Sequence, residues 1–440
     1  MTTKPPSGTR DFLPADVRRR EHVIGIVRAV YESYGCEPIE TPAFENIETL
    51  LGKYGEEGNK LIFKILKRGE HEASGEADLA LRYDLTVPLA RVIAQYQNEL
   101  PKFFKRYQIQ PVWRADRPAR GRFREFYQCD IDAIGSTSPI VEVELLAAVS
   151  EVLTRLGFRD FVVRLNDRRL LAALMESCAV APERYADVLV SIDKLDKIGR
   201  DAVRQDLLQR GIDAGAADKL LDAFTVGSAA SSDDLARAAG ASETGKAAVE
   251  SLREIVTACA GTAAAGRVKL DPSLARGLSY YTGAIMEIAV PDLAGSLGGG
   301  GRYDNLIGMF LGRDVPACGF SLGLERIIVV MTERGMFPSS VATGAVDIVV
   351  TFLDDASRAE ALKLAGELRA ARFRVDVFPE ASRKFDRPLK YASARGARAM
   401  AIFGENEVTR GEASIRNLDT REQTAVPRSE AVAAIARLLS

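Results

Sequence analysis

Five arginines fall within eleven consecutive residues of this chain, between two stretches that both read as β-strands. The segment WRADRPARGRFREFYQCDID (113–132) contains Arg114, Arg117, Arg120, Arg122 and Arg124. Residues 106–115 precede the turn-rich sequence DRPARG (116–121), and residues 122–132 follow it. Pro118 and Gly121 favour a loop longer than a tight turn. We therefore expect an antiparallel pair of strands joined by an arginine-rich loop.

The alternation of side chains along a strand sorts residues 122–132 into two faces. One predicted face carries Phe123, Tyr127, Cys129 and Ile131, with Glu125 among them, and the other carries Arg122, Arg124, Phe126, Gln128, Asp130 and Asp132. The second face suits a ligand with phosphate at one end, a flat ring in the middle and a cation at the other. Arginine binds phosphate oxygens bidentately, aromatic rings stack on bases, and a carboxylate attracts an ammonium. On spacing alone, a solvated face with alternating salt bridges is an equally good interpretation.

Changes in composition predict two domains. The chain has 440 residues, too many for one ordinary core. Residues 1–165 and 268–330 mix helix and strand patterns, whereas residues 166–266 are almost purely helical and read as an insertion. Glycine, proline and serine indicate a linker at 336–344. Alternating strands and helices beyond it imply a small sheet covered on both faces. We predict a first domain at 1–335, with its insertion at about 166–266, and an α/β domain at 345–440.

Bulk properties exclude several classes of protein. The net charge is −2, so nucleic-acid binding would have to come from local patches and not from a basic body. No apolar run reaches the roughly 18 residues of a membrane span, and the N-terminus lacks a secretory signal. The five cysteines are scattered without a CxxC, and there are only two histidines. We expect a cytoplasmic protein with no metal site of its own and no membrane association.

Three further segments of the first domain are candidates for a binding site. Arg276, Tyr280 and Tyr281 precede an apolar strand, although tyrosine pairs more often pack half-buried than bind ligands. The four consecutive glycines at 298–301 predict room for a ligand or a tight crossing. Arg326 falls in the first turns of a predicted helix, where the macrodipole disfavours a cation, so an anion is expected opposite it. A plain surface arginine is an equally good interpretation.

The last domain contains a basic cluster, SRKFDRPLKYASARGAR (382–398). Its cations are Arg383, Lys384, Arg387, Lys390, Arg395 and Arg398, and Phe385 and Tyr391 lie among them. Basic residues interleaved with aromatic ones are typical of single-stranded RNA binding. Composition alone favours the simpler interpretation, a charged helix face.

Taken together, these segments resemble the histidyl-tRNA synthetases, class II aminoacyl-tRNA synthetases, over nearly the whole chain. GTRDFLP (8–14) is similar to the N-terminal signature of the family, and EPIETPAFE (37–45) to its motif 1 region. LRYDLTVPLAR (81–91) resembles the histidine-binding loop, the arginine hairpin resembles motif 2, and GFSLGLERI (319–327) resembles motif 3. ARGLSYYTGAIMEI and GGGRYDNLIGMF resemble the two histidine-specific signatures. The resemblance implies an α+β catalytic domain built on an antiparallel sheet, a helical insertion, an α/β anticodon-binding domain and a homodimer.

The resemblance also implies a reaction and a set of residue roles. ATP, with Mg²⁺, would activate L-histidine as an adenylate, and the histidyl group would then pass to tRNA(His). The implied histidine-binding residues are Asp84, Leu85, Thr86, Arg114, Gln128, Asp132, Arg276, Tyr280 and Tyr281. The implied ATP-binding residues are Arg114, Asp116, Arg122, Phe126 and Arg326, with Arg276 and Arg114 catalytic. Those implied for tRNA are Arg383, Lys384, Arg387 and Lys390.

Two departures from the family pattern and two alternative functions follow from the same residues. Ser279 stands where the family usually has aspartate, and Ala119-Arg120 replaces a longer polar pair in the loop. The first alternative is a histidine-sensing, non-catalytic paralogue like the regulatory subunit of ATP phosphoribosyltransferase. Such paralogues lack the anticodon domain and often the motif arginines, both of which are present here. The second, a generic RNA-binding protein, would explain the basic cluster but not the arginine hairpin.

Overall fold

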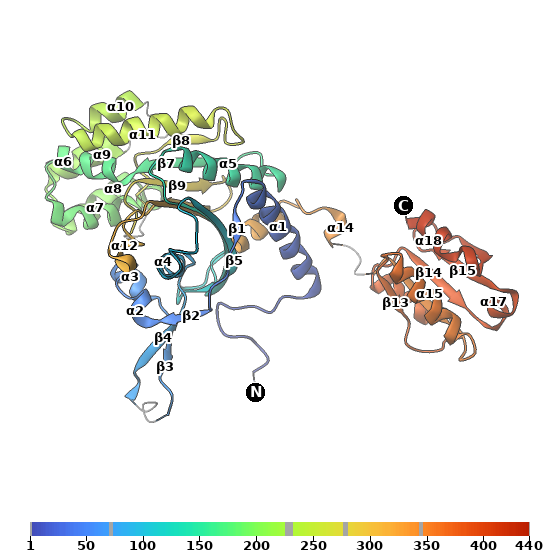
Figure 1. Ribbon diagram of the computed structural model, residues 1–440. Helices are drawn as coiled ribbons and strands as arrows, with labels where there is room; N and C mark the ends of the chain where they lie inside the picture. Colours follow the sequence, from blue (N-terminus) through green and yellow to red (C-terminus); the bar gives the residue numbers. More distant parts are fainter. Residues whose placement is uncertain (1, 70–73, 225–231, 276–279, 343–345, 440) are drawn as a thin grey trace. The chain divides into compact units, whose positions relative to one another are not determined.

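The computed structural model describes residues 2–69, 74–224, 232–275, 280–342 and 346–439 (Figure 1). Clustering of contacts divides the chain into two compact units, Met1–Met336 and Phe337–Ser440. Each unit has its own sheet and its own hydrophobic core.

An eight-stranded sheet organises the first unit, in the order β1-β5-β6-β11-β10-β9-β7-β8. The six strands from β5 to β7 are antiparallel to their neighbours, and only the edge strands β1 and β8 pair in parallel. The predicted antiparallel catalytic sheet is thus confirmed. The strands are β1 (Glu37–Pro38), β5 (Phe104–Trp113), β6 (Glu125–Ile134), β7 (Val162–Asp167), β8 (Val268–Leu270), β9 (Ala284–Ala289), β10 (Ser296–Arg302) and β11 (Ala317–Gly323).

The arginine hairpin is the pair β5–β6, as the sequence predicted. Its register places Arg106 opposite Asp132, Gln108 opposite Asp130 and Gln110 opposite Gln128. The second strand begins at Glu125, three residues later than the alternation suggested. Residues 114–124 therefore form one long connecting loop, called the arginine loop below.

The four-glycine run lies inside β10, at the centre of the sheet. Glycine is needed at positions of this run where the neighbouring backbone leaves no room for a side chain. A Cβ atom at Gly298 would lie 2.5 Å from the Ser321 carbonyl oxygen on β11. A Cβ atom at Gly301 would lie 2.6 Å from the Ala284 carbonyl oxygen on β9. These positions show the predicted tight crossing, and Gly298 and Gly299 also line the cavity described below, as the other predicted explanation requires.

Helices α1 (Pro14–Ser33), α5 (Ile140–Arg155) and α13 (Leu324–Glu333) pack together on the sheet, α13 against β6 and α5 against β11. Helix α4 (Thr86–Gln95) packs in a second cluster with Phe104 and Tyr303. A small sheet, β2 (Phe44–Asn46), β4 (Ala77–Leu81) and β3 (Lys64–Leu66), projects from this unit (Figure 1). The short helices are α2 (Ile47–Leu50), α3 (Gly55–Lys60), α12 (Gly308–Leu311) and, after the unit boundary, α14 (Ser339–Ala342).

A helical insertion enters and leaves the large sheet at two adjacent strands. It follows β7 and ends before β8, and these strands pair in parallel. The green and yellow helices in Figure 1 form this insertion. They are α6 (Arg168–Ser177), α7 (Tyr185–Ile192), α8 (Leu195–Gln209), α9 (Ala214–Phe224), α10 (Ser232–Ala238) and α11 (Glu243–Cys259).

The second unit contains a mixed five-stranded sheet, in the order β13-β12-β14-β15-β16. Helices α15 (Arg358–Ala370) and α18 (Ala431–Leu439) cover one face, and α16 (Asp386–Ala394) covers the other. The predicted covered sheet is confirmed, but its antiparallel end was missed. The strands are β12 (Ile348–Phe352), β13 (Val375–Val377), β14 (Ala399–Phe403), β15 (Glu412–Asn417) and β16 (Gln423–Pro427), and α17 (Glu405–Arg410) links β14 to β15.

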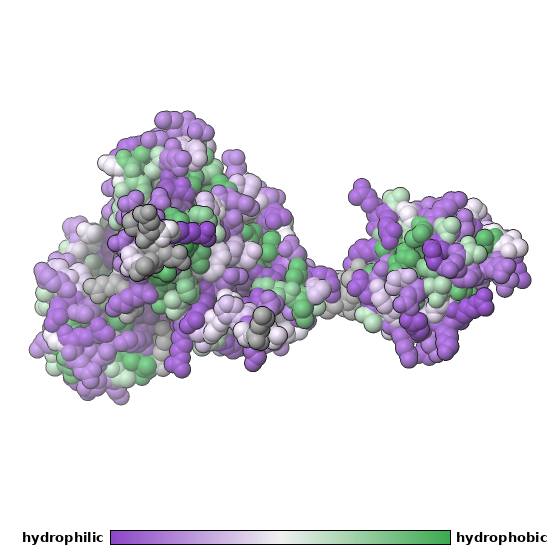
Figure 2. Space-filling model, turned by 90° about the horizontal axis from the view of Figure 1, so that it is seen from below, coloured by the Kyte–Doolittle hydropathy of each residue, from purple (hydrophilic) through white to green (hydrophobic). Residues whose placement is uncertain are grey.

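The face of the molecule in Figure 2 is largely polar. Hydrophilic residues cover most of the face shown in Figure 2, and hydrophobic residues form small separate areas. Among the described residues, no helix has both the length and the apolar character needed to cross a membrane.

Candidate active site

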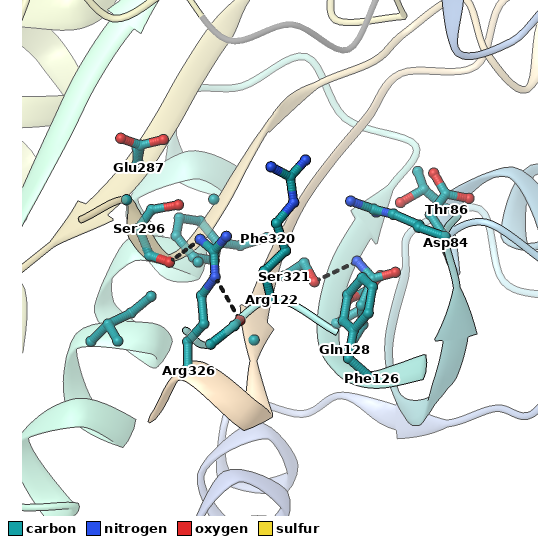
Figure 3. Close-up of a pocket in the computed structure, with 18 of the residues that line it drawn as sticks. Asp84, Thr86, Arg122, Phe126, Gln128, Glu287, Ser296, Phe320, Ser321 and Arg326 are labelled. Carbon is teal, nitrogen blue, oxygen red and sulfur yellow. Dashed lines mark hydrogen bonds between the residues drawn. The ribbon is translucent and has the colours of Figure 1, made fainter. Parts of the chain in front are cut away.

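A cavity of about 1000 Å³ opens on the large sheet of the first unit. Strand β6 and the arginine loop, strands β9–β11 and the starts of α4 and α13 supply most of its walls (Figure 3). It brings together these predicted site residues: Asp84, Thr86, Arg114, Asp116, Arg122, Phe126, Gln128, Asp132, Tyr280, Tyr281 and Arg326. Leu85 does not line the cavity, because its side chain is fully buried. Arg276 and Ser279 lie outside the described residues.

A buried polar network forms where β5 and β6 run side by side. Arg106 is fully buried, with Nη2 2.8 Å from Oδ2 of Asp132 and 3.9 Å from Oδ2 of Asp130. The Tyr303 hydroxyl donates to Oδ1 of Asp132. Burial raises the pKa of both aspartates, and the charge of Arg106 opposes that rise. The sequence analysis missed Arg106, although the alternation Arg106, Gln108, Gln110 marks a polar face on β5 as clearly as on β6.

Two buried acceptors in this part of the cavity have no hydrogen-bond donor within the described chain. They are Oε1 of Gln128 and Oδ1 of Asp130. The Gln128 amide instead donates from Nε2 to Oγ of Ser321, 2.8 Å away (Figure 3). Because buried acceptors are nearly always paired, these two oxygens suit the N–H donors of a bound molecule.

A second buried group of hydrogen bonds centres on Asp84, just before α4. Its carboxylate accepts hydrogen bonds from the Tyr54 hydroxyl at 2.9 Å, the Tyr280 hydroxyl at 3.2 Å and the Val87 backbone N–H at 3.1 Å. Burial raises the pKa of Asp84, and the hydrogen bond from Val87 and the nearby charge of Arg114 oppose it. The Tyr280 and Tyr281 rings meet edge to face at 5.0 Å. The tyrosine pair therefore packs together and also lines the cavity.

Three arginines of the cavity belong to the arginine loop or to the first turn of α13. The guanidinium carbon of Arg114 lies 4.2 Å from the Tyr83 ring centre and 5.1 Å from that of Phe126. Its Nε donates to the Tyr83 carbonyl at 3.0 Å. Stacking on rings leaves the outer nitrogens available for an anion, since it fixes the guanidinium plane without using its donors.

Arg122 and Arg326 complete this positive region (Figure 3). Arg122 forms an ion pair with Asp116 at 2.7 Å. Arg326 is held by two backbone oxygens, donating to Ser296 at 2.6 Å and to Gly121 at 3.3 Å. Arg122, Phe126 and the two aspartates of β6 thus line one cavity, but the charges are not separated into two ends, because Arg106 lies beside the aspartates and Asp116 beside Arg122.

The predicted face of the arginine loop was wrong at two positions, because strand alternation does not extend into a loop. Phe123, assigned to the opposite face, lines the cavity, whereas Arg124 does not. Arg120 also points elsewhere: its Nε donates to Glu333 at 3.0 Å and its Nη1 to the Asp292 carbonyl at 3.1 Å. For Arg120, therefore, the alternative interpretation, a salt bridge on the surface, is the correct one.

The basic cluster of the second unit is exposed at Arg383, Lys384, Arg387 and Lys390. Arg387 forms an ion pair with Glu380 at 2.6 Å. The two interleaved aromatic residues are partly buried, so base stacking by them stays a prediction. Tyr391 donates to Asp376 at 2.7 Å, and Phe385 packs in the cluster between α16 and the sheet.

Comparison with known proteins places this geometry in a family. A family model described as histidyl-tRNA synthetase matches residues 8–327, which contain the whole cavity. The chain belongs to the histidyl-tRNA synthetase family. A second model, described as an anticodon binding domain, matches residues 346–438.

Relatives resemble the chain over its full length. Proteins named histidine–tRNA ligase are 40% identical in Bacteroides fragilis, over 99% of this chain and 100% of the relative, and 42% identical in Gloeobacter violaceus, over 96% and 95%. The crystal structure of histidyl-tRNA synthetase from Nostoc sp. PCC 7120 superposes with a TM-score of 0.81 at 30% identity, covering 99% of each chain. A Bacillus halodurans structure titled ATP phosphoribosyltransferase regulatory subunit/histidyl-tRNA synthetase has a TM-score of 0.74 at 22% identity, which shows a shared fold.

Proposed function

We propose that this chain ligates L-histidine to tRNA(His), using ATP and forming AMP and pyrophosphate. The observation that carries the proposal is the cavity itself. It holds an arginine-rich region beside a buried carboxylate and tyrosine pocket, in a chain whose relatives named histidine–tRNA ligase match it from end to end. The regulatory alternative is weaker, because a second domain that matches an anticodon-binding model is present.

The first chemical step joins two anions. The histidine carboxylate attacks the α-phosphorus of ATP, the bond from that phosphorus to the α,β-bridging oxygen breaks, and pyrophosphate leaves. Negative charge gathers on the α-phosphate in the transition state, so fixed guanidinium groups contribute most of the catalysis. We assign this work to Arg114 and Arg276, with Arg122 and Arg326 on the outer phosphates and Phe126 against adenine. No protein nucleophile is required.

The histidine side of the cavity is proposed to bind both polar ends of the amino acid. Gln128 and Asp132 hold the ammonium, and Asp84 and Thr86 lie beside it. Tyr280 and Tyr281 form a wall of the imidazole pocket. The unpaired Oε1 of Gln128 supports this assignment, and the unpaired Oδ1 of Asp130 offers a further acceptor for the three N–H donors of an ammonium.

We propose that Mg²⁺ enters the cavity bound to the phosphates of ATP. Among the described residues, no group of three or more His, Cys, Asp or Glu side chains could hold a metal ion. A phosphate-bound Mg²⁺ needs only one or two protein carboxylates, because it keeps several waters. Glu287 fits the role of such a carboxylate. It lines the cavity and lies beside Ser296, whose backbone oxygen contacts Arg326 (Figure 3). When bound, the cation would neutralise phosphate charge.

The second unit is proposed to hold the tRNA anticodon through Arg383, Lys384, Arg387 and Lys390. We also propose that the enzyme acts as a homodimer in the cytoplasm. These three assignments rest on membership of the family.

Two assays on the purified protein test the proposed function. Histidine should stimulate the exchange of labelled pyrophosphate into ATP, and tRNA(His) should become charged with histidine. Replacing histidine by another amino acid is the control. Histidine binding without exchange would favour the regulatory paralogue, and tRNA binding with neither activity would favour a generic RNA-binding protein.

Asp132→Asn is expected to weaken the apparent histidine affinity by about 1.5–3 kcal/mol, the scale of a charge-assisted hydrogen bond. The substitution keeps the shape and the acceptor for Tyr303 but removes the negative charge, which also pairs with buried Arg106, so stability should fall as it does in the control below. ATP affinity measured without histidine should change little. Isothermal titration with each substrate measures both values.

Glu142→Gln is the matched control for Asp132→Asn. Glu142 is also a buried carboxylate, paired to Arg302 at 2.7 Å, but it does not line the cavity. It should lose stability without losing histidine affinity. Equal losses of histidine and ATP affinity in Asp132→Asn would assign Asp132 a structural role.

A further inference from the structure

The N-terminal segment, residues 7–12, packs against the arginine loop, although it supplies no residue to the cavity. The Gly8 carbonyl accepts a hydrogen bond from the Arg124 backbone N–H at 2.8 Å. The Arg124 carbonyl in turn accepts from the Arg114 backbone N–H at 2.9 Å. A continuous line of backbone hydrogen bonds therefore runs from the N-terminal segment to the stacked arginine of the cavity.

Only glycine fits at position 8 without strain or a clash. Its φ of +85° is in the left-handed region, and a Cβ atom there would lie 2.6 Å from Cγ of Arg124. The Arg124 side chain lies over Gly8 and donates from Nε to the Asp116 carbonyl at 3.1 Å and from Nη1 to Ser7 at 3.3 Å. Because Asp116 pairs with Arg122, the packing at Gly8 also constrains the second arginine of the cavity.

Arg10 connects the same segment to the two elements that carry the proposed ATP-binding arginines, the arginine loop and α13. These elements form what is called the ATP end of the cavity below. Its guanidinium carbon lies 3.4 Å from the ring centre of Phe123, which lines the cavity. Its Nη2 lies 3.9 Å from Oε1 of Glu325, the residue before Arg326 in α13. Glu325 is buried, and its other oxygen accepts from the Tyr127 backbone N–H at 2.9 Å. Arg10 therefore contacts the arginine loop and the first turn of α13 at once.

We propose that residues 7–12 position the ATP end of the adenylation site, with Gly8 and Arg10 as its two positioning residues. The segment acts through Arg124 and Phe123 on the loop and through Glu325 on α13. The inference rests on the proposed function. The proposal predicts that a change in the segment lowers the use of ATP but not the binding of histidine. The reason is that, among the described residues, no hydrogen bond, ion pair or ring contact joins the segment to Asp84, Gln128 or Tyr280.

Gly8→Ala tests the contact with Arg124. We expect the kcat of pyrophosphate exchange to fall, or the KM for ATP to rise, by about 10-fold or more, because small misplacements of catalytic groups have effects of this size. The KM for histidine should stay within about twofold. Gly35→Ala is the matched control: Gly35 also has a positive φ, +75°, but a Cβ atom there meets nothing within 4 Å. It should bear the same backbone strain without the catalytic loss.

Arg10→Lys tests the stack on Phe123, since it keeps the charge near Glu325 and removes the flat guanidinium. We expect ATP use to fall by about fivefold, within the range for removal of a cation–π interaction. Arg267→Lys is the control, because Arg267 stacks on Phe161 at 4.6 Å away from the cavity. Thermal unfolding of all four variants shows whether test and control lose similar stability.

Three results distinguish the possible outcomes. Losses of ATP use confined to Gly8→Ala and Arg10→Lys, at matched stability, support the proposal. Unchanged exchange in both variants, or equal losses for histidine and ATP, overturns it. A wild-type protein without histidine-dependent exchange would refute the proposed function instead. In that case the ATP dissociation constant, titrated without histidine, still tests whether residues 7–12 organise the ATP end.

Discussion

Arg114→Ala is expected to lower kcat/KM for histidine-dependent pyrophosphate exchange by about 10²-fold or more, the usual effect of removing one donor to a developing oxyanion. The Arg114 guanidinium contacts the Tyr83 and Phe126 rings, and within the described residues its Nε donates to a backbone oxygen whereas its outer nitrogens make no hydrogen bond or ion pair. Its outer nitrogens therefore meet the phosphate without prior rearrangement. Steady-state exchange at varied ATP and histidine concentrations measures the loss.

Two variants in the same loop sharpen this test. Arg120→Ala removes an arginine that is already paired with Glu333 and points away from the cavity, so exchange should stay within about threefold. Arg114→Lys keeps the charge but not the planar fork, and should recover only part of the activity. Equal rates for Arg114→Ala and Arg120→Ala would remove Arg114 from the chemistry. Arg276→Ala should match Arg114→Ala, because the family resemblance implies a catalytic role for both residues.

The sequence predicted the part of the site that lies on regular strands. The alternation along β6 correctly grouped Gln128, Asp130 and Asp132, because the period of a strand is fixed by its backbone. The same rule failed at Phe123 and Arg124, since the strand begins only at Glu125. In the loop, contacts with distant segments set the directions of the side chains: the N-terminal segment contacts Phe123 and Arg124, and Glu333 holds Arg120. No local pattern contains that information.

Arg106 shows a different limit of sequence reasoning. Its partner Asp132 is 26 positions away, and only the strand register brings the two together. Once β5 and β6 are aligned as a hairpin, pairing of their polar faces follows directly. The signal was therefore present in Arg106, Gln108 and Gln110, but it was informative only in combination with the strand opposite.

The hairpin β15–β16 was missed because its pattern is weak. Strand β16 is mostly exposed along its length, so it lacks the run of apolar residues that marks a buried strand. The first three strands of this unit are mostly apolar and were found by that signal. Exposed edge strands are stabilised by pairing with a neighbour, which a single sequence window does not reveal.

Deleting residues 345–440 is expected to lower kcat/KM for tRNA charging by about 10²-fold or more, whereas pyrophosphate exchange falls by less than about threefold. The cavity lies wholly within the first unit, which has its own core, so adenylation does not require the second. Charging requires tRNA, and the loss of one of two linked binding surfaces removes the gain from simultaneous contact. Exchange and charging assays on one preparation, with the dimer measured by light scattering, compare the two activities directly.

A triple variant of the full-length chain locates the tRNA-binding surface within the second unit. Arg383→Gln, Lys384→Gln and Lys390→Gln together should weaken tRNA binding and reduce its salt dependence, by about 0.7–0.9 in slope for each phosphate that is no longer neutralised. Lys363→Gln, Arg369→Gln and Arg372→Gln form the control, because they remove the same charge from α15 and its end, on the opposite face of the sheet from α16. If both triple variants lose slope equally, general charge attracts the tRNA. If neither does, the exposed cations near α16 form a solvated face, and the anticodon is bound elsewhere on this unit.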